Sequence, residues 1–273
     1  GHDDPTMIRT LEEYITSDAL ENEYNDENPF DATKIPLDDK KVLSLFHDTS
    51  ALGIKPEDID GCNLGCLGIP EFGTDFVIQM VQDANPQSLS DLIRISGLSH
   101  GTNVWLGNAQ VLIESGKATI STAICTRDDI MIYLINQGVD SALSFTIMES
   151  VRKGKGLKPE WEEAMKEKDV PDWYIWSCKQ ISYMFPKAHA AAYVMMAYRI
   201  AYCKINYPLA YYGAYFGIRA NAFSYELMCQ GKDKLNYYMK DYKRRSDSLS
   251  NKEQDVLKDM KIVQETVSYT HLT

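Results

Sequence analysis

The sequence predicts an all-α protein whose many helices are joined by irregular loops rich in glycine and proline. Three observations predict this class. Most segments beyond residue 74 repeat their apolar residues at helical spacing and are bounded by Gly, Pro, Asp or Ser. No alternation of apolar and polar residues is long enough to indicate a strand. A chain of 273 residues, 44% hydrophobic and 25% charged, can also bury a sizeable core.

Residues 1–60 form an acidic segment that we expect to contain loops and short helices. This segment holds 16 Asp and Glu against 5 Lys and Arg, so the formal net charge of −11 is local and the remainder is neutral. Overall charge therefore does not exclude nucleic acid as a partner. Apolar residues at helical spacing predict one helix near the start, and Asp38 or Asp39 is expected to cap a second.

The segment Gly53–Thr74 is dense in glycine and proline, and we expect a loop or a switch between subregions there. Nine helices are predicted after it, each with start and stop signals at its ends. Their expected bounds are Phe76–Val81, Leu89–Ile95, Asn108–Glu114, Asp128–Gln137, Ser141–Arg152, Pro159–Lys166, Asp172–Met184, Pro186–Ile205 and Pro208–Arg219.

A charged helical extension is expected over residues 221–265, followed by a non-native tail at 266–273. The tail shows neither the apolar period of the preceding helix nor a stop signal. Val267 to Leu272 is also what the end of a transposon used in library preparation encodes. We therefore interpret the tail as a sequencing scar on a truncated gene and exclude it from fold reasoning.

Six cysteines, without a secretory signal, indicate reduced thiols in a cytoplasmic protein. Cys62 and Cys66 form a lone C-x3-C with no second Cys/His pair nearby, so inert thiols are favoured over zinc. The adjacent carboxylates of Asp128 and Asp129 are interpreted as a helix cap and not as a two-metal site. No catalytic residue and no metal ligand is assigned, and the residues alone indicate binding.

The stretch "YMFPKAHAAAY" combines an apolar helix with a cationic start. Pro186 suits the first helical position, which places Lys187 and His189 in the first turn. Cations are unfavourable there unless a strongly negative ligand, such as a triphosphate, docks at that end. Tyr193 lies one turn beyond His189 on the same face, where it can stack beneath a base. The alternative, a core helix whose Lys187 and His189 reach solvent, is equally open.

The stretch "RISGLSHGTNVWLGN" brings three glycines and three hydroxyl residues, Ser99 among them, beside Arg94 and His100. A loop of this composition can direct several N–H groups at one phosphate. It matches neither the Walker A nor the dinucleotide-binding pattern, so an ordinary helix connection is favoured over a phosphate site.

The stretch "ESVRKGKGLK" places Arg152, Lys153, Lys155 and Lys158 at a helix end. Cations suit a helix C-terminus without any ligand. Two glycines among the four cations would also let the chain follow a phosphate backbone closely. Both interpretations stay open.

Eight strings in chain order resemble consecutive landmarks of the PolC-type DNA polymerase III alpha subunit family, replicative polymerases of Gram-positive bacteria. The resemblance covers roughly residues 1–220 and fades afterwards. The strings are "GHDDPTMIR", "GIPEFGT", "ISGLSHGT.VWLGNAQ", "CTRDDIM.YL", "IMESVRKGKGL", "DVP.WYI.SCK", "YMFPKAHAAAY" and "RIAY.K...PL.YY".

The resemblance implies that residues 61–220 are a helical fingers domain of a DNA-directed DNA polymerase, following a palm that this chain lacks. The catalytic palm aspartates, and the Mg²⁺ they hold, would then lie outside this chain, which would be inactive alone. The implied partners are the incoming dNTP, primer-template DNA, the rest of the polymerase chain and the replisome with its sliding clamp; no membrane partner is expected.

The resemblance also implies site residues. Lys187 and His189 would meet the phosphates of the incoming nucleotide, and Tyr193 the nascent base pair. Further candidates for the triphosphate are Arg94, Ser99 and His100. The candidates for the DNA backbone are Arg152, Lys153 and Lys155.

An alternative from another class is an all-α interaction or nucleic-acid-binding module with no catalytic partner in the same chain. The DNA upstream of residue 1 would separate the two hypotheses. An open frame encoding a palm with paired aspartates favours the polymerase, and a start codon with a ribosome site favours the module.

Overall fold

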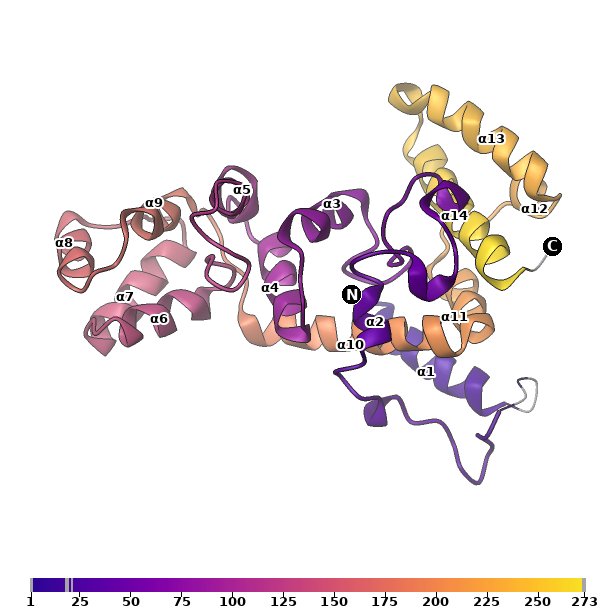
Figure 1. The fold of residues 1–273 in the computed structure, drawn as a ribbon, viewed down its shortest axis with the longest axis horizontal. Coiled ribbons are helices and arrows are strands. Elements are labelled where there is room, and N and C mark those ends of the chain that lie inside the picture. The colour runs from indigo at the N-terminus through magenta and orange to yellow at the C-terminus, as the bar shows by residue number, and fades with distance from the viewer. Residues whose placement is uncertain (1, 18–19, 21, 272–273) are drawn as a thin grey trace. The chain divides into compact units, whose positions relative to one another are not determined.

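The computed structural model describes residues 2–17, 20 and 22–271, and within them it is mainly α-helical, as the sequence predicts. Helical residues make up 64% of the structure, and fourteen α-helices are present in this part of the chain (Figure 1). Its β-structure is one isolated antiparallel bridge between Thr102 and Tyr183. None of the helices in the described residues is both long and apolar enough to span a bilayer.

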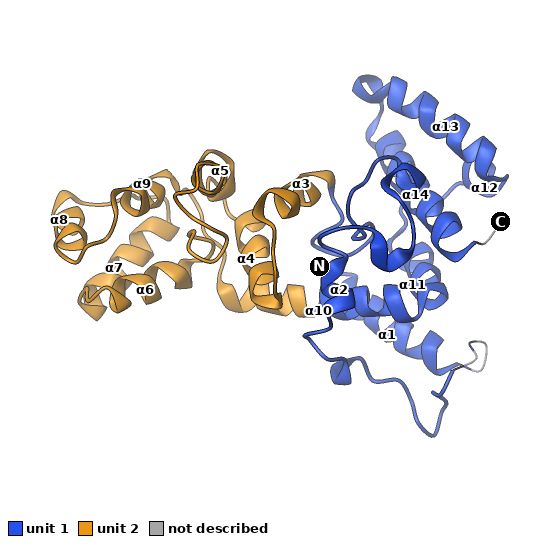
Figure 2. Cartoon of the chain, in the orientation of Figure 1, with its two compact units in different colours: residues 1–74, 196–273 blue, residues 75–195 orange. Residues whose placement is uncertain are grey.

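The chain divides into two compact units, which Figure 2 distinguishes by colour. Unit 1 combines residues 1–74 with residues 196–273, and unit 2 comprises residues 75–195. Helix α10, Lys187–Asn206, begins in unit 2 and ends in unit 1.

Unit 2 is built from seven α-helices and the start of α10. A kinked segment at Trp105–Ala109, whose backbone is non-helical at Leu106 and Gly107, precedes α5. The helices are α3 Asp75–Ala84, α4 Leu89–His100, α5 Gln110–Glu114, α6 Arg127–Asn136, α7 Ser141–Arg152, α8 Pro159–Glu167 and α9 Asp172–Gln180.

Helices α6 and α7 pack against each other and lie side by side in Figure 1. Asp140 caps α7 by accepting a hydrogen bond from the Leu143 N–H, and the helix ends at Arg152, as predicted. Apolar residues of both helices, among them Leu134 and Ile147, are fully buried. Burial of these side chains is the main stabilising contribution to the helix pair.

The predicted helix Asp172–Met184 is wrong at its C-terminal end, because α9 ends at Gln180. The following backbone is extended and pairs with Thr102, whose carbonyl accepts hydrogen bonds from the N–H groups of Ser182 and Tyr183 at 3.1 and 3.3 Å. The helix was predicted too long because Met184 is apolar and continues the helical spacing. In the structure Met184 is buried, but it lies in this extended segment.

The described residues of unit 1 contain the end of α10 and six further α-helices. Residues 53–74 are irregular apart from one 3₁₀ turn, as predicted, and Asp39 caps α2 through the N–H groups of Lys41 and Val42. The helices are α1 Asp4–Thr16, α2 Lys40–Ser44, α11 Pro208–Ala214, α12 Tyr225–Met228, α13 Lys232–Arg244 and α14 Asn251–Thr270.

The core of unit 1 contains a fully buried ion pair. The Lys204 ammonium lies 2.7 Å from the Glu265 carboxylate, and both side chains are 0% exposed. The ammonium also donates hydrogen bonds of 2.8 Å to the carbonyls of Gly65 and Leu67, and the Tyr212 hydroxyl donates to Glu265. The ammonium thereby gains charge-assisted partners in place of water. Sequence patterning indicated only that Lys204 interrupts an apolar stretch.

Helix α14 continues to Thr270, and the Tyr269 hydroxyl donates to the carbonyls of Lys204 and Ile205. It thus includes part of the segment 266–273, which we interpreted from the sequence as a scar. The origin of that segment stays a prediction, and residues 272–273 lie outside the described residues.

Candidate functional site

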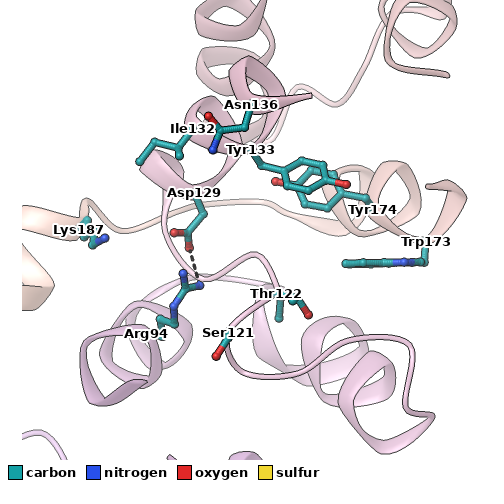
Figure 3. A pocket seen from close by; sticks show the side chains of 11 residues that line it. Arg94, Ser121, Thr122, Asp129, Ile132, Tyr133, Asn136, Trp173, Tyr174 and Lys187 are labelled. Atoms are coloured by element: carbon teal, nitrogen blue, oxygen red, sulfur yellow. Dashed lines mark ion pairs between the residues drawn. The ribbon is translucent and has the colours of Figure 1, made fainter. Parts of the chain in front are cut away.

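A pocket of about 420 Å³ lies in unit 2 beside the start of α10 (Figure 3). Arg94 of α4, the segment Ser121–Ala123, one face of α6, the first turn of α9 and Lys187 of α10 line it. Its volume falls in the range of about 300–1,000 Å³ that is typical of small-molecule sites. Figure 3 shows cationic side chains on one side of the pocket and aromatic side chains on the other.

The cationic end contains Arg94 and Lys187. The Arg94 guanidinium lies 3.7 Å from the Asp129 carboxylate, which is too long for a strong hydrogen bond. Burial is the largest single effect and lowers the pKa of Arg94, but Asp129, Cys125 and Asp91 together more than offset it, so the pKa lies above its ordinary value. Lys187 is exposed, and its ammonium forms no ion pair within the described part of the chain. This end can therefore attract a negative group.

Asp128 and Asp129 are adjacent in α6 but serve different partners. The Asp129 carboxylate accepts hydrogen bonds from the N–H groups of Cys125 and Thr126 at 3.0 and 2.9 Å, which fixes its position at the helix start. The Asp128 carboxylate accepts a 2.8 Å hydrogen bond from the Lys187 N–H and so caps α10. The prediction that these residues act as caps is confirmed, although Asp128 caps a different helix from its own.

The two carboxylates do not converge on one point, and the described residues contain no group of three His, Cys, Asp or Glu that could hold a metal ion. These residues therefore do not fit a Mg²⁺ site.

The aromatic end contains three rings. Tyr133 stacks on Tyr174 with ring centres 4.1 Å apart, and Trp173 meets the edge of Tyr174 at 5.6 Å. Tyr174 is 1% exposed, and burial raises its pKa well above the ordinary value. Its hydroxyl has no hydrogen-bond partner among the described residues. Such an unpaired buried group costs about 1–3 kcal/mol, so a hydrogen-bonding ligand or water would stabilise it.

Five of the six predicted nucleotide-binding residues, all except Ser99, fall into two groups around the start of α10. Arg94 and Lys187 line the pocket. The other group surrounds Phe185 and consists of His100, His189 and Tyr193. Phe185 stacks on His100 at 4.7 Å and lies 6.0 and 6.3 Å from His189 and Tyr193.

This aromatic cluster differs from the predicted arrangement in one respect. Lys187 and His189 are two residues apart, about 200° around a helix, so they project toward different sides of α10. Sequence reasoning missed Phe185, which lies just before α10 and therefore outside its helical repeat.

The start of α10 also differs slightly from the prediction. Pro186 precedes the first helical residue, Lys187, and its carbonyl accepts the first hydrogen bond, from the Ala190 N–H at 3.1 Å. Because Asp128 already accepts from the Lys187 N–H, a protein carboxylate occupies part of the positive helix end.

Residues 94–100 do not form the phosphate-binding loop that was the less favoured alternative for this stretch. They belong to α4, so their N–H groups are used within the helix, and the Ser99 hydroxyl donates to the Ser96 carbonyl at 3.0 Å. Gly97 allows close packing, because an added Cβ would lie 2.7 Å from the Thr126 side chain and 2.8 Å from the Cys125 carbonyl.

The basic segment after α7 is partly neutralised. The Arg152 guanidinium binds the Glu149 carboxylate through two contacts of 2.6 and 2.8 Å. The Lys153 ammonium lies 3.2 Å from the same carboxylate. The hydrogen bond from Arg152 is the main reason that the pKa of Glu149 falls to about 2. Lys155 is exposed and has no ion pair in the part of the chain that the structure describes. Gly154, at φ 74°, approaches the Ser182 carbonyl too closely for a Cβ.

The comparisons with known proteins agree on one family. The model of the bacterial DNA polymerase III alpha subunit finger domain matches residues 4–169. The chain is 52% identical over 257 residues to "DNA polymerase III PolC-type" of Bacillus subtilis (strain 168), which covers 94% of this chain and 17% of that protein. It is 50% identical over 265 residues to the protein of the same name from Staphylococcus aureus (strain MW2), covering 97% and 18%. The chain thus spans less than a fifth of the length of these relatives.

Proposed function

The chain belongs to the finger-domain family of bacterial DNA polymerase III alpha subunits, of the PolC type, and we propose that it forms the fingers of a replicative DNA-directed DNA polymerase. In this role it binds the incoming dNTP and primer-template DNA. The nucleotidyl transfer itself needs groups that the described residues do not supply.

One observation supports nucleotide binding most directly: Arg94 and Lys187, from distant parts of the sequence, line one pocket at the start of α10. Positioned cations stabilise phosphate groups by charge without moving during the reaction. Arg94 offers a planar fork of donors and Lys187 a mobile point charge, so the two can hold different oxygens of one phosphate chain. Ser99 is proposed with them, through a rotation of its hydroxyl away from Ser96.

The aromatic cluster around Phe185 supports the second half of this proposal. His100, His189 and Tyr193 would lie against the base and sugar of the incoming nucleotide, with Phe185 holding the rings in place. Stacking against aromatic rings is tolerant of base identity, as a polymerase that uses four nucleotides requires.

Arg152, Lys153 and Lys155 are proposed to contact the primer-template backbone. Glu149 neutralises one of the three positive charges, so the segment presents a net charge of +2 for phosphates. Lys155 is the cation with no carboxylate partner among the described residues, and we expect it to carry the largest share of this binding.

Mg²⁺ would neutralise part of the triphosphate in such an enzyme, but the residues here do not fit a metal site, so the ions are proposed to be held by another part of the polymerase. The sliding clamp, the replisome, a cytoplasmic location and the domain boundaries at 60, 220 and 265 likewise stay predictions.

The test of the proposed function is Lys187→Ala in a polymerase that carries this chain as its fingers. Loss of a charge-assisted contact of about 1.5–3 kcal/mol should reduce kcat/KM for dNTP by roughly 10- to 150-fold. The matched control is Lys166→Ala, which removes an exposed lysine that does not line the pocket. If both variants retain wild-type kinetics, Lys187 has no role in nucleotide binding.

A further inference from the structure

The aromatic end of the pocket in unit 2 is not used by the proposed contacts to the incoming nucleotide. Those contacts take the cations at one end of the pocket and the cluster around Phe185 for the base. Trp173, Tyr133 and Asn136 line the remaining space, together with Ile132, whose side chain is 53% exposed. The apolar and aromatic side chains at this end are therefore partly open to solvent.

We propose that this aromatic end holds one unpaired base of a single DNA strand. The inference rests on the part of the proposed function that says the chain binds DNA. It adds a second base-binding site, distinct from the one assigned to the incoming nucleotide.

Three observations carry the inference. Two separate aromatic groups flank the start of α10, one around Phe185 and one around Tyr174, and one nucleotide has only one base to stack. The pocket is larger than a phosphate chain requires, and only its other end is charged. The hydroxyl of Tyr174 is buried without a hydrogen-bond partner among the described residues, in a side chain that lines this end.

The lining favours a DNA strand of any sequence over a ligand with a particular ring system. Asn136 is the one side-chain amide among the lining residues, so base edges meet few fixed donors and acceptors. Flat aromatic surfaces bind every base through its face, and each stacked base contributes affinity without sequence preference.

Hydroxyl side chains of the pocket can contact the sugar-phosphate backbone of the strand. Ser121 and Thr122 are exposed, line the pocket and lie between Arg94 and Trp173 in the view of Figure 3. Hydroxyl groups are common partners of phosphate oxygens in DNA complexes. A strand that passes these residues can turn its base toward Trp173 and leave Arg94 and Lys187 for the incoming nucleotide.

The experiment uses the 273-residue chain and oligo(dT), which quenches tryptophan fluorescence when a base stacks on the indole. We expect oligo(dT) to quench the wild type and Trp176→Phe, and to quench Trp173→Phe much less. Trp176 is the matched control, since it is exposed on the same helix but does not line the pocket. Anisotropy of a labelled oligo(dT) should show about 5- to 150-fold weaker binding by Trp173→Ala. Circular dichroism confirms that each variant is folded.

Two results would overturn the inference: equal quenching of the wild type and Trp173→Phe, or quenching of Trp173 by dTTP with Mg²⁺ that competes with oligo(dT). The second result would place the incoming base in the pocket. The proposed function is tested separately by Lys187→Ala, which should weaken dTTP binding and leave the oligo(dT) quenching of Trp173 in place. Unchanged dTTP binding would count against the proposed function, whatever the outcome for Trp173.

Discussion

Replacing Glu149 by Gln should strengthen the binding of this chain to DNA. In the native protein the Glu149 carboxylate binds Arg152 through two contacts and Lys153 through one. Glutamine keeps the shape of the side chain and an acceptor oxygen but removes the negative charge. The substitution therefore leaves α7 intact and releases both cations for phosphates.

The size of the effect follows from the charges. The net charge of this segment is +2 in the wild type, from three cations and one carboxylate (Arg152, Lys153, Lys155 and Glu149). In the Glu149→Gln variant it is +3. Each further phosphate contact steepens the slope of log K against log salt by about 0.9. Between 50 mM and 200 mM salt, the variant should lose roughly 3.5-fold more affinity than the wild type, from a higher starting affinity at low salt.

The pH dependence is a second part of the same prediction. The pKa of Glu149 is lowered to about 2 by its cationic partners, below the ordinary value of 4.5. The stabilisation from this pairing is therefore fully present above pH 4.5 and is lost as pH falls through about 2. Between pH 5 and 8 the carboxylate stays ionised, so the difference between Glu149→Gln and the wild type should not change with pH.

The assay is fluorescence anisotropy of a labelled primer-template duplex at several salt concentrations. Glu163→Gln is the matched control, because it makes the same change in net charge at an exposed residue of α8. An identical salt slope for Glu149→Gln and Glu163→Gln would show that the segment after α7 does not face DNA.

Three further predictions concern stability and reactivity. Lys204→Met leaves the Glu265 carboxylate buried without its cation and should cost about 3–5 kcal/mol in urea unfolding; adding Glu265→Gln should recover part of this, and a cost below 1 kcal/mol would contradict the buried pair. Gly97→Ala should cost about 1–3 kcal/mol in the same assay, because its Cβ would meet the facing loop, and a neutral effect would contradict the packing. Iodoacetamide at pH 8 should label exposed Cys229 quickly and spare Cys178, whose pKa is raised to about 12 by burial; mass spectrometry of the native protein measures the order, and labelling of Cys178 before Cys229 would contradict the burial.

Local sequence signals predicted the elements that are fixed by local chemistry. The bounds of α7 follow from an N-cap aspartate and a basic, glycine-rich end, and the structure reproduces them. The predicted cap of α2 by Asp39 is likewise confirmed. In both cases the deciding hydrogen bonds join residues only two or three positions apart.

Contacts between distant residues could not be predicted in this way. Only the fold brings Asp128 to the N–H of Lys187, 59 positions away, or Lys204 to the carbonyl of Gly65. The pairing of Thr102 with Tyr183, which shortens α9, is of the same kind. The role of Glu149 was within reach, since carboxylates three and four positions before Arg or Lys on a helix are expected to pair with them.

The neighbouring carboxylates of α6 have a consequence for ligand selection. Asp129 lies 3.7 Å from the Arg94 guanidinium, and Asp128 accepts a hydrogen bond from the Lys187 N–H, so adjacent residues of α6 contact both cationic residues. The cationic end would then discriminate among anions by the distance between their negative groups, in addition to their total charge.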